Sequence, residues 1–285
     1  MILIAESGST KCDWVLLDSS KTVPTRIRTK GLNPAILKKK ELKNIISENV
    51  ELAGYKEQVK SIYFFGAGCN TSKNKNNVHL VLNAYFNKAT SIVEEDTMAA
   101  VYATTNTPAV VCILGTGSNC CFYDGVSIIN KSISLGYIVM DEGSGNHLGK
   151  ELLKGYYYRQ MPENLRILFN KKYDLKEKKV IKKLYQSKTP NKYLANFAPF
   201  VFENEEHPFM KKLINEVMDI FIKNHILQYS KELETVPLHF VGSIAFHGKE
   251  CISNQLKKHG LNAASYIQRP IDNLINYIKA ENSIT

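Results

Sequence analysis

Short apolar and β-branched runs, separated by Gly, Ser, Asp and Pro, open the chain. The pattern predicts strands over residues 2–5, 12–17, 23–29, 61–65 and 91–93, and helices over 37–53, 78–86 and 97–104. Strands that give way to alternating helices and strands indicate an α/β domain in the first third of the chain.

A similar pattern begins again after residue 106. It predicts strands over 109–114, 119–123, 238–241 and 264–268, a mostly helical stretch over 145–233, and helices over 249–259 and 271–280. Asp124-Gly125 is a hairpin signal after the second of these strands.

The two halves share a short residue pattern. Ile4, Gly8, Ser9, Cys12 and Trp14 recur 109 residues later as Ile113, Gly117, Ser118, Cys121 and Tyr123 (117 − 8 and 121 − 12). Internal similarity suggests two related halves that each open with strand, turn and strand. Two unrelated hairpins could also produce so short a match.

Length and composition favour a two-domain globular protein. The chain has 285 residues, of which 44% are hydrophobic and 22% charged, and no apolar run approaches the roughly 20 residues of a membrane span. No basic segment precedes the first apolar run, so we expect a cytoplasmic protein without a membrane partner. The net charge of +10 is spread over lysine-containing segments that also carry acids. This favours solvated helix faces over a nucleic-acid surface, and a basic field would also attract ATP.

The six cysteines form no CxxC pair and no grouping with His at metal-ligand spacing. We therefore expect free thiols, with Cys120 and Cys121 as small buried side chains in a strand. His147 has no partner at metal spacing and is interpreted as structural, and Trp14 is expected in the core.

The first turn, Glu6 to Lys11, places small residues and hydroxyls between two strands. Its Gly and Ser/Thr groups could bind phosphate oxygens, and Glu6 could hold a hydrated Mg²⁺. It is not a P-loop, because no Gly-Lys-Ser/Thr opens a helix here. A Gly/Ser hairpin alone is more often only a hairpin.

Two acidic positions stand at predicted strand-to-helix junctions. Asp96 could cap the helix that follows it, or could act as the base for an attacking hydroxyl, a task that an Asp of ordinary pKa can perform in phosphoryl transfer. Asp141-Glu142 precedes Gly143-Ser144-Gly145, where adjacent acids are costly unless they bind something or cap the helix.

These motifs together resemble the N-acetylglucosamine kinases of the BadF/BadG/BcrA/BcrD ATPase family, within the actin–hexokinase–Hsp70 superfamily. The resemblance rests on Gly115-Thr116-Gly117-Ser118-Asn119-Cys120, Leu135-Gly136-Tyr137, Asp141-Glu142-Gly143-Ser144, Glu6-Ser7-Gly8-Ser9-Thr10, Asn33-Pro34, Asp96 and Val241-Gly242-Ser243-Ile244. It spans the chain from the first strand to about Gln268.

The resemblance implies an α/β fold of two ribonuclease-H-like domains with a nucleotide cleft between them. They would span residues 1–106 and 107–269, with a helical insertion at about 144–233 and a C-terminal helix, about 270–285, packed back on the first domain. Asp96 would be the catalytic base, and Glu6 would hold Mg²⁺ through water. The nucleotide ATP would contact Ser9, Thr10, Lys11, Gly115, Thr116, Gly117, Gly242 and Ser243. The amino sugar would contact Asn33, Gly68, Ser118, Asn119, Gly136 and Asp141, and the product would be its 6-phosphate. A homodimer is compatible with the family.

Two residues depart from the family pattern on the sugar side. Leu135 stands where Trp is usual, and Met140 stands where Gly is usual. On the metal side, Glu6 replaces a more usual Asp. The acceptor therefore stays open among N-acetylglucosamine, glucosamine, N-acetylmuramic acid and related sugars.

Two other functions fit parts of the sequence. An ATPase that activates an iron–sulfur dehydratase would use cysteines for a cluster between subunits, but Cys112, Cys120 and Cys121 stand beside the phosphate turn. A non-catalytic sugar sensor would lack the base, whereas Asp96 is present; as a repressor it would need a helix-turn-helix, for which no room precedes the strand at Ile2.

Overall fold

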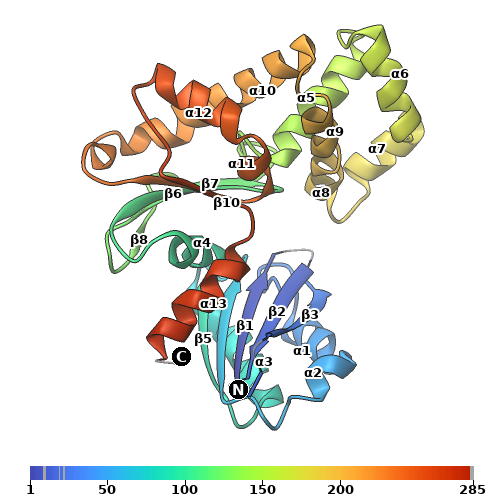
Figure 1. Ribbon diagram of the computed structural model, residues 1–285. Coiled ribbons are helices and arrows are strands. Elements are labelled where there is room, and N and C mark those ends of the chain that lie inside the picture. The colour runs from blue at the N-terminus through green and yellow to red at the C-terminus, as the bar shows by residue number, and fades with distance from the viewer. Residues whose placement is uncertain (9–10, 19, 22, 283–285) are drawn as a thin grey trace. The chain divides into compact units, whose positions relative to one another are not determined.

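The protein is described by a computed structural model that covers residues 1–8, 11–18, 20–21 and 23–282. Its contacts divide the chain into two compact units, Met1–Asn106 with Arg269–Thr285, and Thr107–Gln268. Each unit contains a mixed five-stranded β-sheet with helices packed on it, so the predicted α/β class is confirmed (Figure 1).

The first unit is built on a sheet of strand order β3-β2-β1-β4-β5. Its elements are β1 (Ile2–Ser7), β2 (Lys11–Leu17), β3 (Thr25–Lys30), α1 (Lys39–Ser47), α2 (Val50–Ala53), β4 (Ser61–Gly66), α3 (Ser72–Tyr85), β5 (Thr90–Glu95), α4 (Asp96–Thr104) and α13 (Pro270–Glu281). β2 is antiparallel to β1 and β3, whereas β4 is parallel to β1 and β5.

Alternate residues of β1 serve two hydrophobic cores, one on each face of the sheet. Leu3 and Ala5 join the core under α1 and α3, whereas Ile2 and Ile4 join the core under α4 and α13. This is the period-two alternation of a strand that is covered on both sides. α13 packs against α4 and β1, and Tyr277 stacks on Tyr102 with ring centroids 4.2 Å apart.

The second unit has a sheet of order β10-β9-β6-β7-β8 and many more helices. Its elements are β6 (Ala109–Leu114), β7 (Ser118–Tyr123), β8 (Ile128–Ile129), α5 (Gly145–Tyr157), α6 (Glu163–Lys172), α7 (Glu177–Tyr185), α8 (Pro190–Ala195), α9 (Ala198–Glu203), α10 (Pro208–Phe221), β9 (Leu238–Val241), α11 (Ser243–His247), α12 (Lys249–Lys258) and β10 (Ser265–Ile267). A π-helical turn, Ile222–Ile226, continues α10.

The two sheets share one topology, with β1 to β5 corresponding to β6 to β10. In both, three antiparallel strands come first and two parallel strands follow on the other side of the first strand. The strand starts are 107 residues apart (109 − 2 and 118 − 11), not the 109 of the sequence match. Thus Gly8 follows β1, whereas Ser118, the partner of Ser9 in the sequence match, already belongs to β7.

Single residues explain where the element predictions succeeded or failed. The predicted helix over 37–53 is two helices: the first ends with Glu48 as its C-cap, and Asn49 caps the second by accepting the N–H of Leu52 at 2.8 Å. Trp14 is buried as predicted, and its indole N–H donates to Thr29 Oγ1 at 2.9 Å. Cys120 and Cys121 are small buried side chains in β7, also as predicted.

None of the helices in the described part of the chain is both long and apolar enough to cross a bilayer. Lysines of α6, α7 and α10 are exposed, and three of them pair with acids of the same unit: Lys172 with Glu203, Lys179 with Asp174 and Lys211 with Glu206. The structure thus places them on solvated helix faces.

Candidate functional site

The carboxyl ends of three parallel strands lie together at one edge of the first sheet. In register, Ser7 of β1 stands beside Gly66 of β4, which stands beside Glu95 of β5. Glu6 lies near the end of β1 and Asp96 directly follows β5, so both are at this edge, and the charge of Asp96 acts on Glu6. The edges of such sheets where parallel strands end are the usual ligand sites of α/β proteins.

Glu6 carries a carboxylate in an acidic, half-buried place. Burial raises its pKa to about 7, and the negative charges of Asp13 and Asp96 add to that shift, whereas Lys11 and Arg269 oppose it. Lys11, predicted to contact the nucleotide, is on β2, and its Nζ binds Asp13 Oδ2 at 2.9 Å.

Asp96 is the first residue of α4, so the capping role that the sequence allowed for it is wrong. The N-cap position belongs to Glu95, which makes no side-chain capping bond. The Asp96 side chain is exposed. Surrounding protein still raises its pKa above the usual value, and the backbone N–H groups of Asp96 and Thr97 oppose this by donating to the carboxylate.

Asn33 is buried next to the same edge. Ser7, itself fully buried, accepts the N–H of Leu32 through Oγ at 2.8 Å and so fixes the chain just before Asn33. Asn33 Oδ1 accepts the N–H of Ala35 at 2.9 Å and lies against Gly68, which has a φ of +80°. The structure therefore brings together Asn33, Gly68 and the ends of β1 and β4. Ser9 and Thr10, predicted to bind phosphate, lie outside the described residues.

In the second unit, a tight turn joins β6 to β7 and is tied to the start of α5. The Gly115 N–H donates to the Gly117 carbonyl at 2.9 Å, and the Gly145 N–H donates to the Gly115 carbonyl at 2.8 Å. Asn146 donates twice to the carbonyl of Thr116, from its backbone N–H at 3.1 Å and from Nδ2 at 2.8 Å. The exposed Thr116 side chain thus sits on a fixed backbone.

Asp141 lies against this turn. Its Oδ1 accepts the Ser118 N–H at 3.3 Å, and its Oδ2 accepts Asn146 Nδ2 at 2.9 Å. A side chain at Gly117 would meet the Asp141 carboxylate at 2.9 Å, so glycine is required there. Asp141 adopts a φ of 71°, a backbone conformation rare for non-glycine residues, and burial raises the pKa of its carboxyl. Strain of this kind concentrates at functional sites.

Two buried polar atoms at this place have no hydrogen-bond partner among the described residues: Ser118 Oγ and Asn146 Oδ1. Both belong to residues that donate to Asp141. The sequence motif pointed to Ser118 and Asp141 but missed Asn146. An Asn near the start of a helix is common, and nothing in its sequence position indicates that it is fully buried.

The acids before α5 do not cap it, contrary to one of the two roles that the sequence left open. Ser144 is the N-cap and accepts the N–H of His147. Glu142 instead binds His225 Nε2 at 2.9 Å, on the π-helical turn, and this partnership lowers the pKa of Glu142 although burial opposes it. The turn is thus fixed by a helix that is distant in sequence.

The remaining predicted residues occupy turns of the second unit. Gly242, with a φ of +113°, leads from β9 into α11, and Ser243 is the exposed first residue of that helix. Asn119 is half-buried on β7, and its Oδ1 accepts the Cys120 N–H at 2.9 Å. Gly136 has a φ of +77° and accepts the Met140 N–H at 2.8 Å.

The two residues that depart from the family pattern on the sugar side contact each other. The backbone N–H of Leu135 donates to Met140 Sδ at 3.3 Å, and the Leu135 side chain is 62% exposed. The turn that they share leads directly into Asp141 in the sequence.

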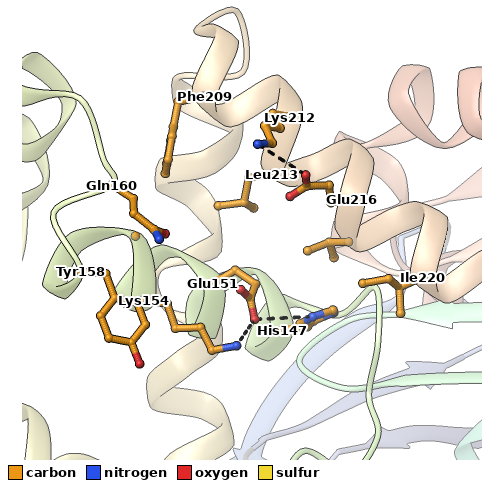
Figure 2. A pocket seen from close by; sticks show the side chains of 12 residues that line it. His147, Glu151, Lys154, Tyr158, Gln160, Phe209, Lys212, Leu213, Glu216 and Ile220 are labelled. Carbon is orange, nitrogen blue, oxygen red and sulfur yellow. Dashed lines mark hydrogen bonds and ion pairs between the residues drawn. The ribbon is translucent and has the colours of Figure 1, made fainter.

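A separate pocket of about 600 Å³ lies between α5 and α10 (Figure 2). His147 forms part of its wall: Nδ1 accepts the Gly143 N–H at 3.2 Å, and Nε2 lies 3.9 Å from Glu151 Oε1. Burial lowers the pKa of His147. The ring thus supports the Asp141–Gly145 turn, the structural role predicted for it.

The described residues contain no group of three or more His, Cys, Asp or Glu that could hold a metal ion by themselves. A Mg²⁺ ion that keeps most of its waters needs only one or two carboxylates. Burial is the main cause of the raised pKa of Glu6, and the negative charges of Asp13 and Asp96 add to it. A cation would offset these charges, so the residues present fit a hydrated Mg²⁺ at Glu6.

Comparisons with known proteins show that the chain is similar to solved structures, one of which is similar along its whole length. It is a candidate N-acetylglucosamine kinase from Porphyromonas gingivalis, 35% identical over 99% of this chain and 100% of the other, with a TM-score of 0.92. No protein-family model matches, and no curated protein sequence matches significantly.

More distant structures share the fold. A candidate N-acetylglucosamine kinase from Chromobacterium violaceum is 13% identical, with a TM-score of 0.69 over 97% of this chain and 98% of the other. A ROK family glucokinase from Streptomyces griseus, solved with glucose and AMPPNP, is 11% identical, with a TM-score of 0.54 over 93% of both chains. This chain therefore shares its α/β fold with these two kinase structures.

Proposed function

Because this chain belongs to the family of the Porphyromonas gingivalis candidate N-acetylglucosamine kinase, we propose that it transfers the γ-phosphoryl group of ATP to an amino sugar. The acceptor atom is the 6-hydroxyl oxygen, and the products are the sugar 6-phosphate and ADP. The sequence motifs support our proposal that the chain is one of the BadF/BadG/BcrA/BcrD ATPases of the actin–hexokinase–Hsp70 superfamily.

In this proposal, the first unit supplies the base. Asp96 accepts the proton of the sugar hydroxyl as its oxygen bonds to the γ-phosphorus and the bond from phosphorus to the ADP oxygen breaks. The transition state of phosphoryl transfer is loose, so the proton leaves late and a weakly basic carboxylate suffices. A hydrated Mg²⁺ at Glu6 would neutralise charge on the ATP phosphates. Ser9, Thr10 and Lys11 face the nucleotide, and Asn33 with Gly68 faces the sugar.

The second unit holds phosphates with one side of its β6–β7 turn and the sugar with the other. Gly115, Thr116 and Gly117 of the turn contact the phosphates, and Gly242 with Ser243 binds the adenosine part. Ser118, Asn119, Gly136 and Asp141 bind the sugar. Backbone N–H groups and hydroxyls in a glycine turn suit anionic oxygens, and a buried carboxylate suits hydroxyl donors.

One observation carries the proposal furthest: the Asp141 carboxylate is hydrogen-bonded to Ser118, which follows the Gly115–Gly117 turn, and to Asn146 of α5, beside two buried polar atoms without partners among the described residues. An unpartnered buried polar group is destabilising, so a hairpin with only a structural role would be more stable without such atoms. A ligand with hydroxyl groups would satisfy them.

The identity of the acceptor sugar depends on Leu135 and Met140. Because these two residues contact each other next to Asp141, we propose that they set the space for the substituent on the sugar ring. N-acetylglucosamine, glucosamine and N-acetylmuramic acid differ at the positions that such a space would select.

The experiment is an assay of ADP formation from Mg-ATP with each sugar of an amino-sugar panel. We expect one of them to stimulate ADP formation well above the rate without sugar. Asp96→Asn should lose about 100-fold or more of that rate, within the range for loss of a general base. Asp124→Asn is the matched control, because the exposed Asp124 accepts the N–H groups of Val126 and Ser127 in the turn between β7 and β8. Equal ADP formation with and without every sugar would rule the proposal out.

A further inference from the structure

Asn146 holds the two halves of the second unit's site together. Its Nδ2 donates to the Thr116 carbonyl at 2.8 Å and to Asp141 Oδ2 at 2.9 Å, and its backbone N–H donates again to Thr116 at 3.1 Å. One fully buried side chain thus connects the backbone of the turn to the carboxylate. A change at Asn146 would therefore act on both halves at once.

The partners of Asn146 also fix which way its amide points. Both neighbours of Nδ2 are oxygen acceptors, so the nitrogen must face them and Oδ1 must face away. Oδ1 is buried and finds no donor among the described residues. An unpartnered buried carbonyl is unfavourable, so the site retains a destabilising feature that a donor from a ligand would remove.

Ser118 resembles Asn146 in that it also donates a hydrogen bond to Asp141, at the other carboxylate oxygen, and also carries a buried oxygen without a partner among the described residues. Its N–H donates to Asp141 Oδ1 at 3.3 Å, while its buried Oγ has no partner among the described residues. Each Asp141 oxygen has accepted one of these hydrogen bonds and keeps a further acceptor direction. The three side chains therefore offer a hydroxyl, a carboxylate and an amide oxygen, a set that suits adjacent hydroxyl groups on one molecule.

We propose that Asn146 is a sugar-binding and positioning residue: its Oδ1 accepts a hydrogen bond from a hydroxyl of the bound sugar, and its Nδ2 links that sugar to the phosphate turn. This inference rests on the proposed function and adds a residue and a direction of bonding to it. Occupancy of the sugar site then steadies the Thr116 carbonyl and the turn that it belongs to.

A purely structural role for Asn146 predicts a different effect of its removal on ligand binding. If the residue only held the turn, its removal would weaken all ligands alike and would be indifferent to any one sugar hydroxyl. If Oδ1 binds a particular hydroxyl, removing the amide and removing that hydroxyl should not be additive, because both delete the same bond.

The test compares wild type and Asn146→Ala in binding the preferred amino sugar and its monodeoxy analogues, measured by titration calorimetry. We expect Asn146→Ala to weaken binding of the parent sugar roughly 10-fold, the size of one or two hydrogen bonds. One deoxy analogue should bind wild type roughly 10-fold more weakly than the parent, yet bind the variant as well as the parent does. Asn204→Ala is the control, since Asn204 Nδ2 donates to the Phe200 carbonyl at 2.8 Å within α9 and its flank, and it should leave every affinity unchanged.

Asn146→Ser serves the same comparison if the alanine variant unfolds, which melting followed by circular dichroism would reveal. A folded variant that binds the parent sugar like wild type overturns the inference. So does a series in which each deoxy analogue loses the same factor in both proteins. If the wild-type protein binds no amino sugar and shows no sugar-dependent ADP formation, the proposed function is contradicted instead. This result can be distinguished from the two results that overturn only the role of Asn146.

Discussion

Gly68 has no space for a side chain because Asn33 occupies it: a Cβ atom at Gly68 would lie 2.1 Å from Asn33 Oδ1. Gly68 also has a φ of +80°, which disfavours any other residue. Asn33 comes from the segment after β3 and Gly68 from the turn after β4, so this contact sets where the two segments meet at the carboxyl edge of the first sheet.

Gly68→Ala should therefore displace Asn33. We expect a KM for the sugar that rises several-fold or more and a lowered melting temperature, because the φ cost of about 1 kcal/mol and the clash add. Steady-state kinetics and calorimetric melting measure the two effects. Gly260→Ala isolates the φ cost, since Gly260 has a φ of +71° and a Cβ atom there would lie in open space. A Gly68→Ala enzyme with the sugar KM of Gly260→Ala would contradict the placement of Asn33 at the sugar.

Gly242→Ala should disturb the nucleotide end of the second unit. A Cβ at Gly242 would lie 2.3 Å from the Leu114 carbonyl oxygen, and the φ of +113° is unfavourable for alanine. Since β6 ends at Leu114, the turn after β9 must move away from the β6–β7 turn. We expect ADP affinity to fall by at least 10-fold, about the effect of losing two or more hydrogen bonds. Titration of ADP checks it.

Gly125→Ala is the matched variant for Gly242. Gly125 has a φ of +100°, but a Cβ there would make only ordinary contacts with Pro108 at 3.6 Å. Its ADP affinity should equal that of wild type. If both variants bound ADP equally well, Gly242 would not belong to the nucleotide site.

The pKa of Glu6 predicts how stability changes with pH. Burial raises this pKa from 4.5 to about 7. The ionised form is then less favourable in the folded protein than in the unfolded chain, so stability is lost as pH rises from 4.5 through 7. Glu6→Gln cannot ionise, and it should be more stable than wild type by about 3 kcal/mol at about pH 8 and nearly equal to it at about pH 4.5.

Melting temperatures of the two proteins at about pH 4.5 and about pH 8 measure this difference. Glu57→Gln is the control: Glu57 is exposed and pairs with Lys88 at 2.9 Å, which lowers the pKa of Glu57 instead. The melting temperature of Glu57→Gln should not exceed that of wild type at the higher pH. A Glu6→Gln protein that melts below wild type there, without nucleotide or Mg²⁺, would contradict the burial of an ionisable carboxyl at this edge.

Much of the architecture could be predicted from the sequence because local patterns determine it. Short apolar strands, such as the almost fully buried β1, and glycine turns between strands leave a clear signal in the sequence. The duplicated topology was suggested by a five-residue match, although strand positions differ by two residues from that match. The break in the helix predicted over 37–53 depended on one capping residue, Asn49, whose effect a hydrophobic pattern does not contain.

The candidate site was only partly predictable for a related reason. Asp141 and Ser118 stand in motifs, whereas Asn146 matters because its amide reaches a carbonyl 30 residues earlier. His225 supports Glu142 from 83 residues away. Such contacts arise from packing between segments distant in sequence, and the residue types alone do not reveal them.

The position of the transferred phosphate tests the central claim most directly. Wild-type protein is incubated with Mg-ATP and the amino sugar that best stimulates ADP formation, and the product is examined by phosphorus–proton correlation spectroscopy. We predict a phosphorus signal correlated with the two protons on carbon 6 of the sugar, at a yield that matches the ADP formed. Phosphorus found only as inorganic phosphate, or correlated with the proton on carbon 1, would contradict the assignment of this chain as a kinase acting on the 6-hydroxyl of an amino sugar.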